Sequence, residues 1–256
     1  MIRPDRVIAL RGSQTVFQYK DLCAKVYSRT HSCADVLREA GNLAAAWEGG
    51  ASVPGLIEVR QQNGRWMMVT EYIPGETLAQ RIGSGKDRLS SCLRILVQAQ
   101  RHLQKVPPDR FPSLTESLRR EIAQTSLDPS IRSKLLSRLD GPEEGSCLCH
   151  RNLSPDNLLL PAGRNPVAVD WSRACRGNAD ADAAAVWILL ETEYGQDAAQ
   201  LYLDLYCGLS GRQERDILRW VPVMAASRIP GSVQRERERL KDLIRQSLKG
   251  WDEYGD

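Results

Sequence analysis

The chain has 256 residues, of which 42% are hydrophobic and 26% are charged. This length and composition suit an ordinary globular protein with one large domain or two lobes. Its 35 Lys and Arg residues against 32 Asp and Glu residues leave a formal net charge of +3, which argues against nucleic acid or an acidic membrane as the partner.

Several features indicate a cytoplasmic protein without a membrane span. The N-terminus lacks the apolar stretch of a signal peptide, and the longest apolar run, residues 183–190, is far shorter than the roughly 20 residues that span a bilayer. The seven cysteines include no CxxC pair, which fits reduced thiols. Cys147, Cys149 and His150 are too crowded for a tetrahedral zinc site.

The first seventy residues alternate β patterns with one helix. Strands are expected at residues 6–10, 15–19 and 22–27. Helical spacing predicts a helix over residues 32–47, with Ser32 as N-cap and Asp35 three residues later. Strands at 56–59 and 66–72 form a hairpin through Asn63-Gly64, the strongest short hairpin signal in the chain.

A break at residues 73–77, Ile-Pro-Gly-Glu-Thr, separates this part from a mainly helical remainder. A block of short strands and loops between residues 146 and 182 interrupts the helices. We therefore predict an α+β protein with an N-terminal lobe of residues 1–73 and a C-terminal lobe of residues 74–256. Helical patterns cover residues 89–106, 114–124, 130–139, 183–193, 197–207, 211–226 and 233–249.

The most informative stretch is residues 150–157, His-Arg-Asn-Leu-Ser-Pro-Asp-Asn. It matches the kinase catalytic-loop pattern H-R-D-L-x-x-x-N at every fixed position except the third. Asp170 follows Asn157 by thirteen residues, at the end of a β-like segment. These two side chains supply the hard oxygen ligands that suit Mg²⁺.

Lys25 stands in a predicted strand, and Glu39 lies on the helix that follows. Phosphoryl transfer from ATP needs positive charge on the phosphates, which Lys25 supplies while Glu39 holds it in position. The loop of residues 11–14, which includes Ser13, offers backbone N–H groups to phosphate, but its single glycine makes that signal weak. The alternative is a solvated strand lysine and a surface glutamate.

Taken together, these motifs resemble the aminoglycoside phosphotransferase and choline/thiamine kinase-like family, a branch of the protein-kinase-like fold. Residues 71–78 resemble the family's interlobe hinge, whose backbone receives adenine. Asp170-Trp171 resembles its "DW" metal motif, and residues 177–184 resemble its "GDPxxDLA" segment. The resemblance covers nearly the whole chain and implies a bilobal fold, with a small β-rich N-lobe containing one long helix and a mainly helical C-lobe.

The resemblance also implies the cofactors ATP and Mg²⁺ and assigns residues to them. By this match Asp182 braces the catalytic loop and His150 shapes it. The nucleotide residues are Lys25, Glu39, Ser13, Glu71 and Ile73, and the metal ligands are Asn157 and Asp170.

Asn152 departs from the family, whose usual aspartate accepts the acceptor's hydroxyl proton and orients the nucleophile. A carboxamide is not a base near neutral pH, and general-base catalysis is typically worth ~10²–10⁴-fold. Three explanations remain open: a pseudokinase that regulates or scaffolds, an active or weakly active enzyme in which another group receives the proton, and an engineered replacement of aspartate.

The sequence favours a kinase-like phosphotransferase that binds MgATP and transfers the γ-phosphate to a hydroxyl of a small molecule, impaired by Asn152. The alternative is a non-catalytic pseudokinase, for which a protein partner is possible. Residues 212–249 carry ten Lys and Arg against five Asp and Glu, a net +5. Because an aminoglycoside is a polycation, we expect a neutral or anionic hydroxylated acceptor; the alternative is that these arginines form a solvated helix face.

Overall fold

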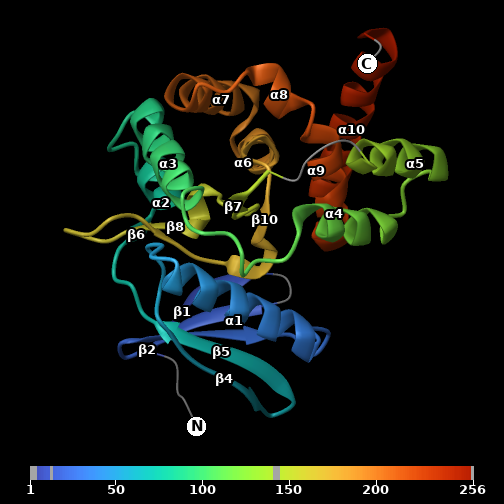
Figure 1. Cartoon of the computed structure of the whole chain (residues 1–256). Helices are drawn as coiled ribbons and strands as arrows, with labels where there is room; N and C mark the ends of the chain where they lie inside the picture. The colour runs from blue at the N-terminus through green and yellow to red at the C-terminus, as the bar shows by residue number, and fades with distance from the viewer. Residues whose placement is uncertain (1–4, 12–13, 141–144, 255–256) are drawn as a thin grey trace. The chain divides into compact units, whose positions relative to one another are not determined.

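The structure is a computed structural model that describes residues 5–11, 14–140 and 145–254 (Figure 1). The chain forms two compact units, one of residues up to 87 together with 155–174, the other of residues 88–154 and those from 175 onward. In this division residues 74–87 and 155–174 belong to the first unit. The α+β fold class is confirmed.

The first unit is built on a five-stranded antiparallel sheet with the strand order β1-β2-β3-β5-β4. The expected strands are present, and the turn at Asn63-Gly64 has the two positive φ angles, 52° and 70°, that a tight hairpin turn requires. The strands are β1 (Arg6–Arg11), β2 (Gln14–Tyr19), β3 (Leu22–Tyr27), β4 (Leu56–Gln62) and β5 (Arg65–Glu71).

Helix α1 (Cys33–Glu48) follows β3 and begins at the predicted N-cap. The Ser32 hydroxyl accepts a hydrogen bond from the Asp35 amide at 3.1 Å, and the Asp35 carboxylate accepts one from the Ser32 amide at 3.3 Å. These two bonds satisfy backbone donors that the first turn of a helix leaves open. The expected capping box is confirmed.

A small sheet with the order β6-β8-β9 joins distant parts of the chain within the first unit. Its strands are β6 (Glu76–Thr77), β8 (Leu158–Leu160) and β9 (Val167–Ala168). Helix α2 (Leu78–Ser84) follows β6 and was not expected, although Thr77 and Gln80 form a capping box at its start. Two short 3₁₀ helices, Pro155–Asn157 and Trp171–Arg173, flank β8 and β9.

The second unit is mainly helical and contains one two-stranded sheet. The helix expected over residues 211–226 is two helices, because Pro222 lies in the first turn of α9, where its ring does not allow a preceding helix to continue. The elements are α3 (Leu89–Leu103), α4 (Leu114–Ala123), α5 (Pro129–Ser137), β7 (Cys147–Cys149), β10 (Cys175–Gly177), α6 (Ala179–Tyr194), α7 (Gln196–Ser210), α8 (Glu214–Leu218), α9 (Val221–Arg228) and α10 (Gln234–Tyr254).

Helix α6 forms the centre of the second unit. It packs against α7, α8, α9 and β7, and its residues from Asp180 to Val186 are all buried. A helix buried on all sides is expected to be apolar all round. The two aspartates of this stretch, Asp180 and Asp182, therefore need polar partners inside the unit.

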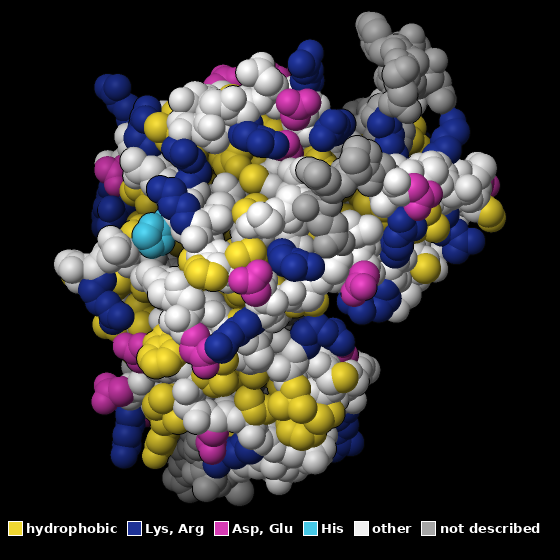
Figure 2. All heavy atoms as spheres, viewed as in Figure 1, with side chains coloured by type: hydrophobic (Ala, Val, Ile, Leu, Met, Phe, Trp, Pro, Cys, Tyr) yellow, Lys and Arg dark blue, Asp and Glu magenta, His cyan; other side chains and the backbone are white. Residues whose placement is uncertain are grey.

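The surface carries charges of both signs. On the face shown in Figure 2, acidic side chains lie among the Lys and Arg side chains, so the small net positive charge is not gathered into one patch there. No helix among the described residues is long and apolar enough to cross a membrane.

Candidate active site

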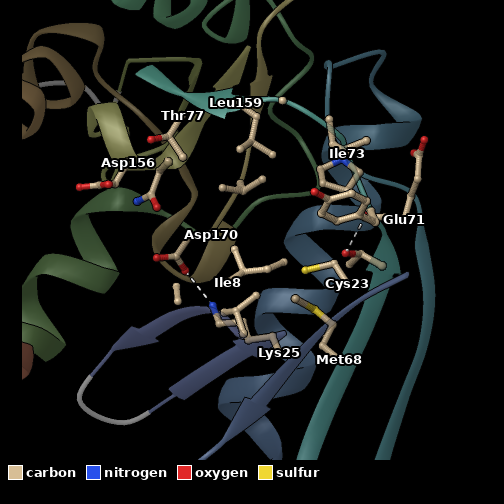
Figure 3. Close-up of a pocket in the computed structure, with 18 of the residues that line it drawn as sticks. Ile8, Cys23, Lys25, Met68, Glu71, Ile73, Thr77, Asp156, Leu159 and Asp170 are labelled. Carbon is tan, nitrogen blue, oxygen red and sulfur yellow. Dashed lines mark hydrogen bonds and ion pairs between the residues drawn. The ribbon is translucent and has the colours of Figure 1, made fainter. Parts of the chain in front are cut away.

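A cavity of about 620 Å³ opens within the first unit (Figure 3). This volume is in the range typical of small-molecule sites. Strands β1, β2, β3 and β5, helix α1 and the segment around β8 and β9 contribute to its walls. Six of the residues expected to bind nucleotide or metal line it, whereas Ser13 lies outside the described residues; the six are Lys25, Glu39, Glu71, Ile73, Asn157 and Asp170.

Lys25 projects from β3 between two carboxylates. Its Nζ donates to Glu39 Oε1 at 2.6 Å and to Asp170 Oδ1 at 3.0 Å, the latter drawn in Figure 3. Burial acts to lower the pKa of Lys25, but the carboxylates of Asp170 and Glu39 outweigh it, so this pKa is raised. The amine therefore stays protonated near neutral pH.

Tyr27 completes this network from the same face of β3. Its hydroxyl donates to Glu39 Oε2 at 2.8 Å, so both oxygens of Glu39 are engaged. Burial, together with the neighbouring carboxylate, raises the pKa of Tyr27, which keeps the phenol a neutral donor. Sequence reasoning missed Tyr27, although its position two residues after Lys25 in a strand places both side chains on one face.

The cavity carries oxygen ligands suitable for a metal ion. Asp170 has an unusual left-handed backbone with φ of 68°, and the backbone amide of Val169 donates to the Asn157 carbonyl at 3.0 Å, which ties the two segments together. Lys25, Glu39 and Asp170 carry one positive and two negative charges, so a cation is electrostatically acceptable beside them. The residues present fit Mg²⁺, which binds through hard oxygens and keeps several waters.

No group of three or more His, Cys, Asp or Glu side chains within the described parts of the chain is arranged to hold a metal ion. The candidate magnesium site therefore depends on one carboxylate and one amide. This small ligand set matches an ion that is shared with substrate phosphates rather than enclosed by protein.

The two ends of the cavity differ in character. In Figure 3 the charged side chains of Lys25, Asp170 and Asp156 lie toward one end, while Ile73 and Glu71 lie toward the other. Apolar side chains line the space between, among them Ile8, Met68 and Leu159. This arrangement suits a ligand with a flat apolar part and an anionic part. Asp156 was expected to be a solvated neighbour of the site, and it is exposed but also lines the cavity.

Asn42 on α1 anchors the segment that carries Asp170. Its side-chain amide donates to the backbone carbonyls of Trp171 at 2.9 Å and Ala174 at 3.3 Å. The buried Trp171 indole in turn donates to the Ala168 carbonyl at 3.1 Å. No local pattern identified Asn42, because its partners lie about 130 residues later in the chain.

The loop after β7 belongs to the second unit up to Ser154. The Arg151 amide donates to Asp182 Oδ1 at 2.8 Å, and Gln100 and Gln104 donate to Asp182 Oδ2 at 2.8 and 3.2 Å. His150 is fully buried, and its Nδ1 accepts from the Asn152 amide at 3.3 Å. These contacts are consistent with the expectation that Asp182 braces the loop and that His150 shapes it.

The Arg151 side chain is buried and ion-paired. Its Nη2 donates to Glu121 Oε2 at 2.6 Å and to Ser227 Oγ at 3.2 Å. Although burial acts to lower the pKa of Arg151, Glu121 outweighs it and raises this pKa. The backbone of Arg151 is left-handed, with φ of 59°, a conformation that persists in a non-glycine residue only where its surroundings enforce it.

Asn152 has a partner that the sequence did not reveal. Arg228, the last residue of α9, donates from Nη1 to Asn152 Oδ1 at 3.4 Å and from Nη2 to Glu236 Oε1 at 3.2 Å. The position that usually carries a catalytic carboxylate is thus a neutral amide beside an arginine.

The fold is that of a protein-kinase-like phosphotransferase. Its marks are the Lys25–Glu39 ion pair of the first unit and the His-Arg-x-Leu loop of the second. The family model described as "Phosphotransferase enzyme family" matches residues 6–221. The chain belongs to this family. A comparison with curated proteins finds no match.

Solved structures with the same fold are aminoglycoside phosphotransferases and a choline kinase. Aminoglycoside-3'-phosphotransferase of type VIII is 21% identical, with 87% of this chain and 93% of that chain covered and a TM-score of 0.63. Aminoglycoside phosphotransferase APH(4)-Ia is 14% identical, with 95% of this chain and 92% of that chain covered and a TM-score of 0.70. Choline kinase LicA from Streptococcus pneumoniae is 16% identical, with 98% of this chain and 95% of that chain covered and a TM-score of 0.62. The expected family resemblance is confirmed.

Proposed function

We propose that the chain binds MgATP in the cavity of the first unit and transfers the γ-phosphoryl group to a small-molecule acceptor. Family membership supports phosphotransferase chemistry. The observation that carries the nucleotide part is the Lys25–Glu39–Asp170 network, with Asn157 lining the same cavity. Among the similar structures, one holds AMP-PNP and hygromycin B, and another holds ATP and streptomycin.

Each cavity residue has a role in this proposal. Lys25 binds the α/β-phosphates, and Glu39 keeps its ammonium group in position. The hinge backbone at Glu71 and Ile73 receives the adenine edge, and Ser13 belongs to the loop that offers N–H groups to phosphate. Asn157 and Asp170 would hold Mg²⁺, which, when bound, neutralises charge on the phosphate oxygens.

Asn152 lowers the expected turnover without removing it. Phosphoryl transfer passes through a loose transition state, for which positioning and electrostatics supply most of the catalysis. A carboxamide still orients an acceptor through hydrogen bonds. A nucleotide-binding regulator is the second candidate, and the loss of the carboxylate at this position is the observation that favours it.

The acceptor we propose is neutral or anionic rather than an aminoglycoside. The guanidinium of Arg228 lies against Asn152, so this position has a positive neighbour and disfavours a polycation. Hygromycin B and streptomycin are ligands of the similar phosphotransferases, so the acceptor is where this chain is expected to differ.

The nucleotide proposal is tested by thermal unfolding with MgATP. At 100 times Kd, binding adds ~2.7 kcal/mol to the free energy of unfolding. We expect Lys25→Met to weaken MgATP binding by ~10-fold or more, because a phosphate loses its charged partner. Lys86→Met, an exposed lysine outside the cavity, serves as the control and leaves the shift unchanged. An unchanged melting temperature of the wild-type protein at millimolar MgATP would exclude the proposal.

A further inference from the structure

The five-stranded sheet of the first unit has a second face, opposite the one that carries Lys25. Lys25 and Met68 line the cavity of about 620 Å³, which we call the first cavity. Successive side chains of a strand point to opposite faces of a sheet. Val26 of β3 and Met67 of β5 therefore lie on the other face, which we call the outer face. Helix α1 packs on the first face, where its Glu39 meets Lys25.

A second cavity, of about 420 Å³, opens on the outer face. Its floor is apolar and consists of Phe17, Val26 and Met67, one residue from each of three neighbouring strands. Met67 is 3% exposed and belongs to a small buried cluster against which Phe17 and Val26 pack. Among the described residues, those that line the second cavity and those that line the first cavity are different. The two cavities are therefore separate sites on opposite faces of one sheet.

Two arginines stand at one end of the second cavity. Arg29 follows the end of β3, and Arg65 begins β5. Because Val26 lies opposite Met67 in this antiparallel pair of strands, the end of β3 and the start of β5 meet at the same end of the sheet. Both arginines are exposed, and both line the second cavity.

The charge of these two arginines is not neutralised within the described parts of the chain. Neither Arg29 nor Arg65 has an ion pair there, and no Asp or Glu is among the described residues that line the second cavity. Glu58 on the neighbouring strand β4 is already paired with Arg60, at 3.3 Å. Gln62 adds a carboxamide to the wall. The second cavity thus combines an apolar floor with an uncompensated positive end.

We propose that the second cavity binds a small aromatic carboxylate, with its ring on the apolar floor and its carboxylate at Arg29 and Arg65. Phenylalanine and methionine side chains such as Phe17 and Met67 both make favourable contacts with aromatic rings. Guanidinium groups form charge-assisted hydrogen bonds with a carboxylate. The volume is at the lower end of the range for small-molecule sites, which fits one ring on a short chain. This inference does not depend on the proposed MgATP-dependent transfer.

Two consecutive methionines supply the readout. In NMR spectra of protein with isotope-labelled methionine methyl groups, Met67 reports on the second cavity and Met68 on the first. The probes are 4-phenylbutyrate, 4-phenylbutanol and 4-phenylbutylamine, which differ in the charge of the end group. We expect nuclear Overhauser effects from the ring protons of 4-phenylbutyrate to the methyl group of Met67 but not to that of Met68. The acid should bind at least ~5-fold more tightly than the alcohol, and the amine most weakly.

Arginine variants test the charged end of the cavity. Arg29→Gln and Arg65→Gln change exposed side chains, so we expect the fold to persist. The double variant R29Q/R65Q should bind the acid and the alcohol with affinities within ~2-fold of each other, because the charge-assisted hydrogen bonds are lost. R38Q is the matched control, since Arg38 is an exposed arginine of the same unit that does not line the second cavity. It should keep the full preference for the acid.

Four results overturn the inference. The first is the absence of any effect at Met67 with millimolar 4-phenylbutyrate. The second is ring contact with Met68 instead, together with displacement by MgATP, which would put the ligand in the first cavity. The third is equal affinity of the wild-type protein for the acid and the alcohol. The fourth is binding of the peptide acetyl-Glu-Phe-Glu-amide ~10-fold more tightly than 4-phenylbutyrate, which would assign the surface to a protein partner.

Failure of MgATP to bind would overturn the proposed function alone. The readout at Met67 needs no nucleotide, so the two proposals fail separately.

Discussion

Asp182 shows how one buried carboxylate shapes a loop. It is 1% exposed and accepts hydrogen bonds from the Arg151 backbone amide and from the side chains of Gln100 and Gln104. Tyr202 donates to Gln100 at 2.6 Å and so extends the network to α7. A buried charge is tolerated only when it is paired and hydrogen-bonded in this way.

Removing this carboxylate should be costly. In Asp182→Ala two buried donors and the partly buried Gln104 lose their acceptor, and we expect the free energy of unfolding to fall by about 2–4 kcal/mol. Urea denaturation measures the change. Asp204→Ala is the control, because Asp204 is exposed and accepts a surface hydrogen bond from Gln200, and it should cost less than ~0.5 kcal/mol. Equal stability of the two variants would contradict the bracing role.

The segment between β5 and α2 depends on a glycine. Gly75 has φ of 157°, and a Cβ added there would lie 2.8 Å from the carbonyl oxygen of Leu160. This close approach is part of the pairing of β6 with β8, in which Glu76 faces Leu160. The segment of residues 73–77, which the sequence marked as a break, thus has a definite place against β8.

Three glycine-to-alanine variants separate backbone strain from collision. Gly75→Ala combines strain with a clash against backbone, and we expect it to cost more than ~2 kcal/mol. Gly64→Ala has φ of 70° but open space around the added methyl, so it should cost ~1 kcal/mol. Gly83→Ala, in α2 with nothing within 4 Å, should be neutral or stabilise by up to ~1 kcal/mol.

Urea denaturation of the three proteins ranks these costs. A Gly75→Ala protein as stable as Gly83→Ala would show that the backbone moves to accept the methyl. In that case the close packing of residues 73–77 on β8 would not be required for the fold.

The first unit is assembled from two stretches of chain. Besides the β6–β8 pairing, Ala168 donates to the Ser52 carbonyl at 3.0 Å, and Asn42 donates to the Trp171 carbonyl at 2.9 Å. Residues 155–174 therefore supply part of this unit's packing and hydrogen bonding. A single cut in the chain does not separate the two compact units.

This division predicts the behaviour of fragments. Residues 1–87 alone should unfold without a cooperative transition, because β6 loses its partner and α1 loses the contact with Trp171. Joining residues 1–87 to 155–174 through a Gly/Ser linker should restore a cooperative urea transition. In the joined fragment, Trp171→Ala is expected to cost about 3–5 kcal/mol. A cooperative and equally stable 1–87 fragment would contradict this division.

Much of the fold was predictable because its signals are local. Alternation of side chains marked the strands, Asn63-Gly64 marked the hairpin turn, and Ser32 with Asp35 marked the start of α1. The division of residues 211–226 into α8 and α9 was missed although Pro222 is visible in the sequence. Helix α2 was missed because it is short and follows a segment rich in breaking residues.

The sequence was sufficient for the family, for the fold class and for six residues that line one cavity of the first unit, since motif spacing and side-chain periodicity are properties of short stretches. It did not indicate that Asn42 anchors Trp171, that Gln100 binds Asp182, or that Arg228 donates to Asn152. These pairs are separated by 76 to 129 residues. Hydrogen bonds between such distant residues exist only once packing brings their elements together, and that is why the tertiary structure alone decided these contacts.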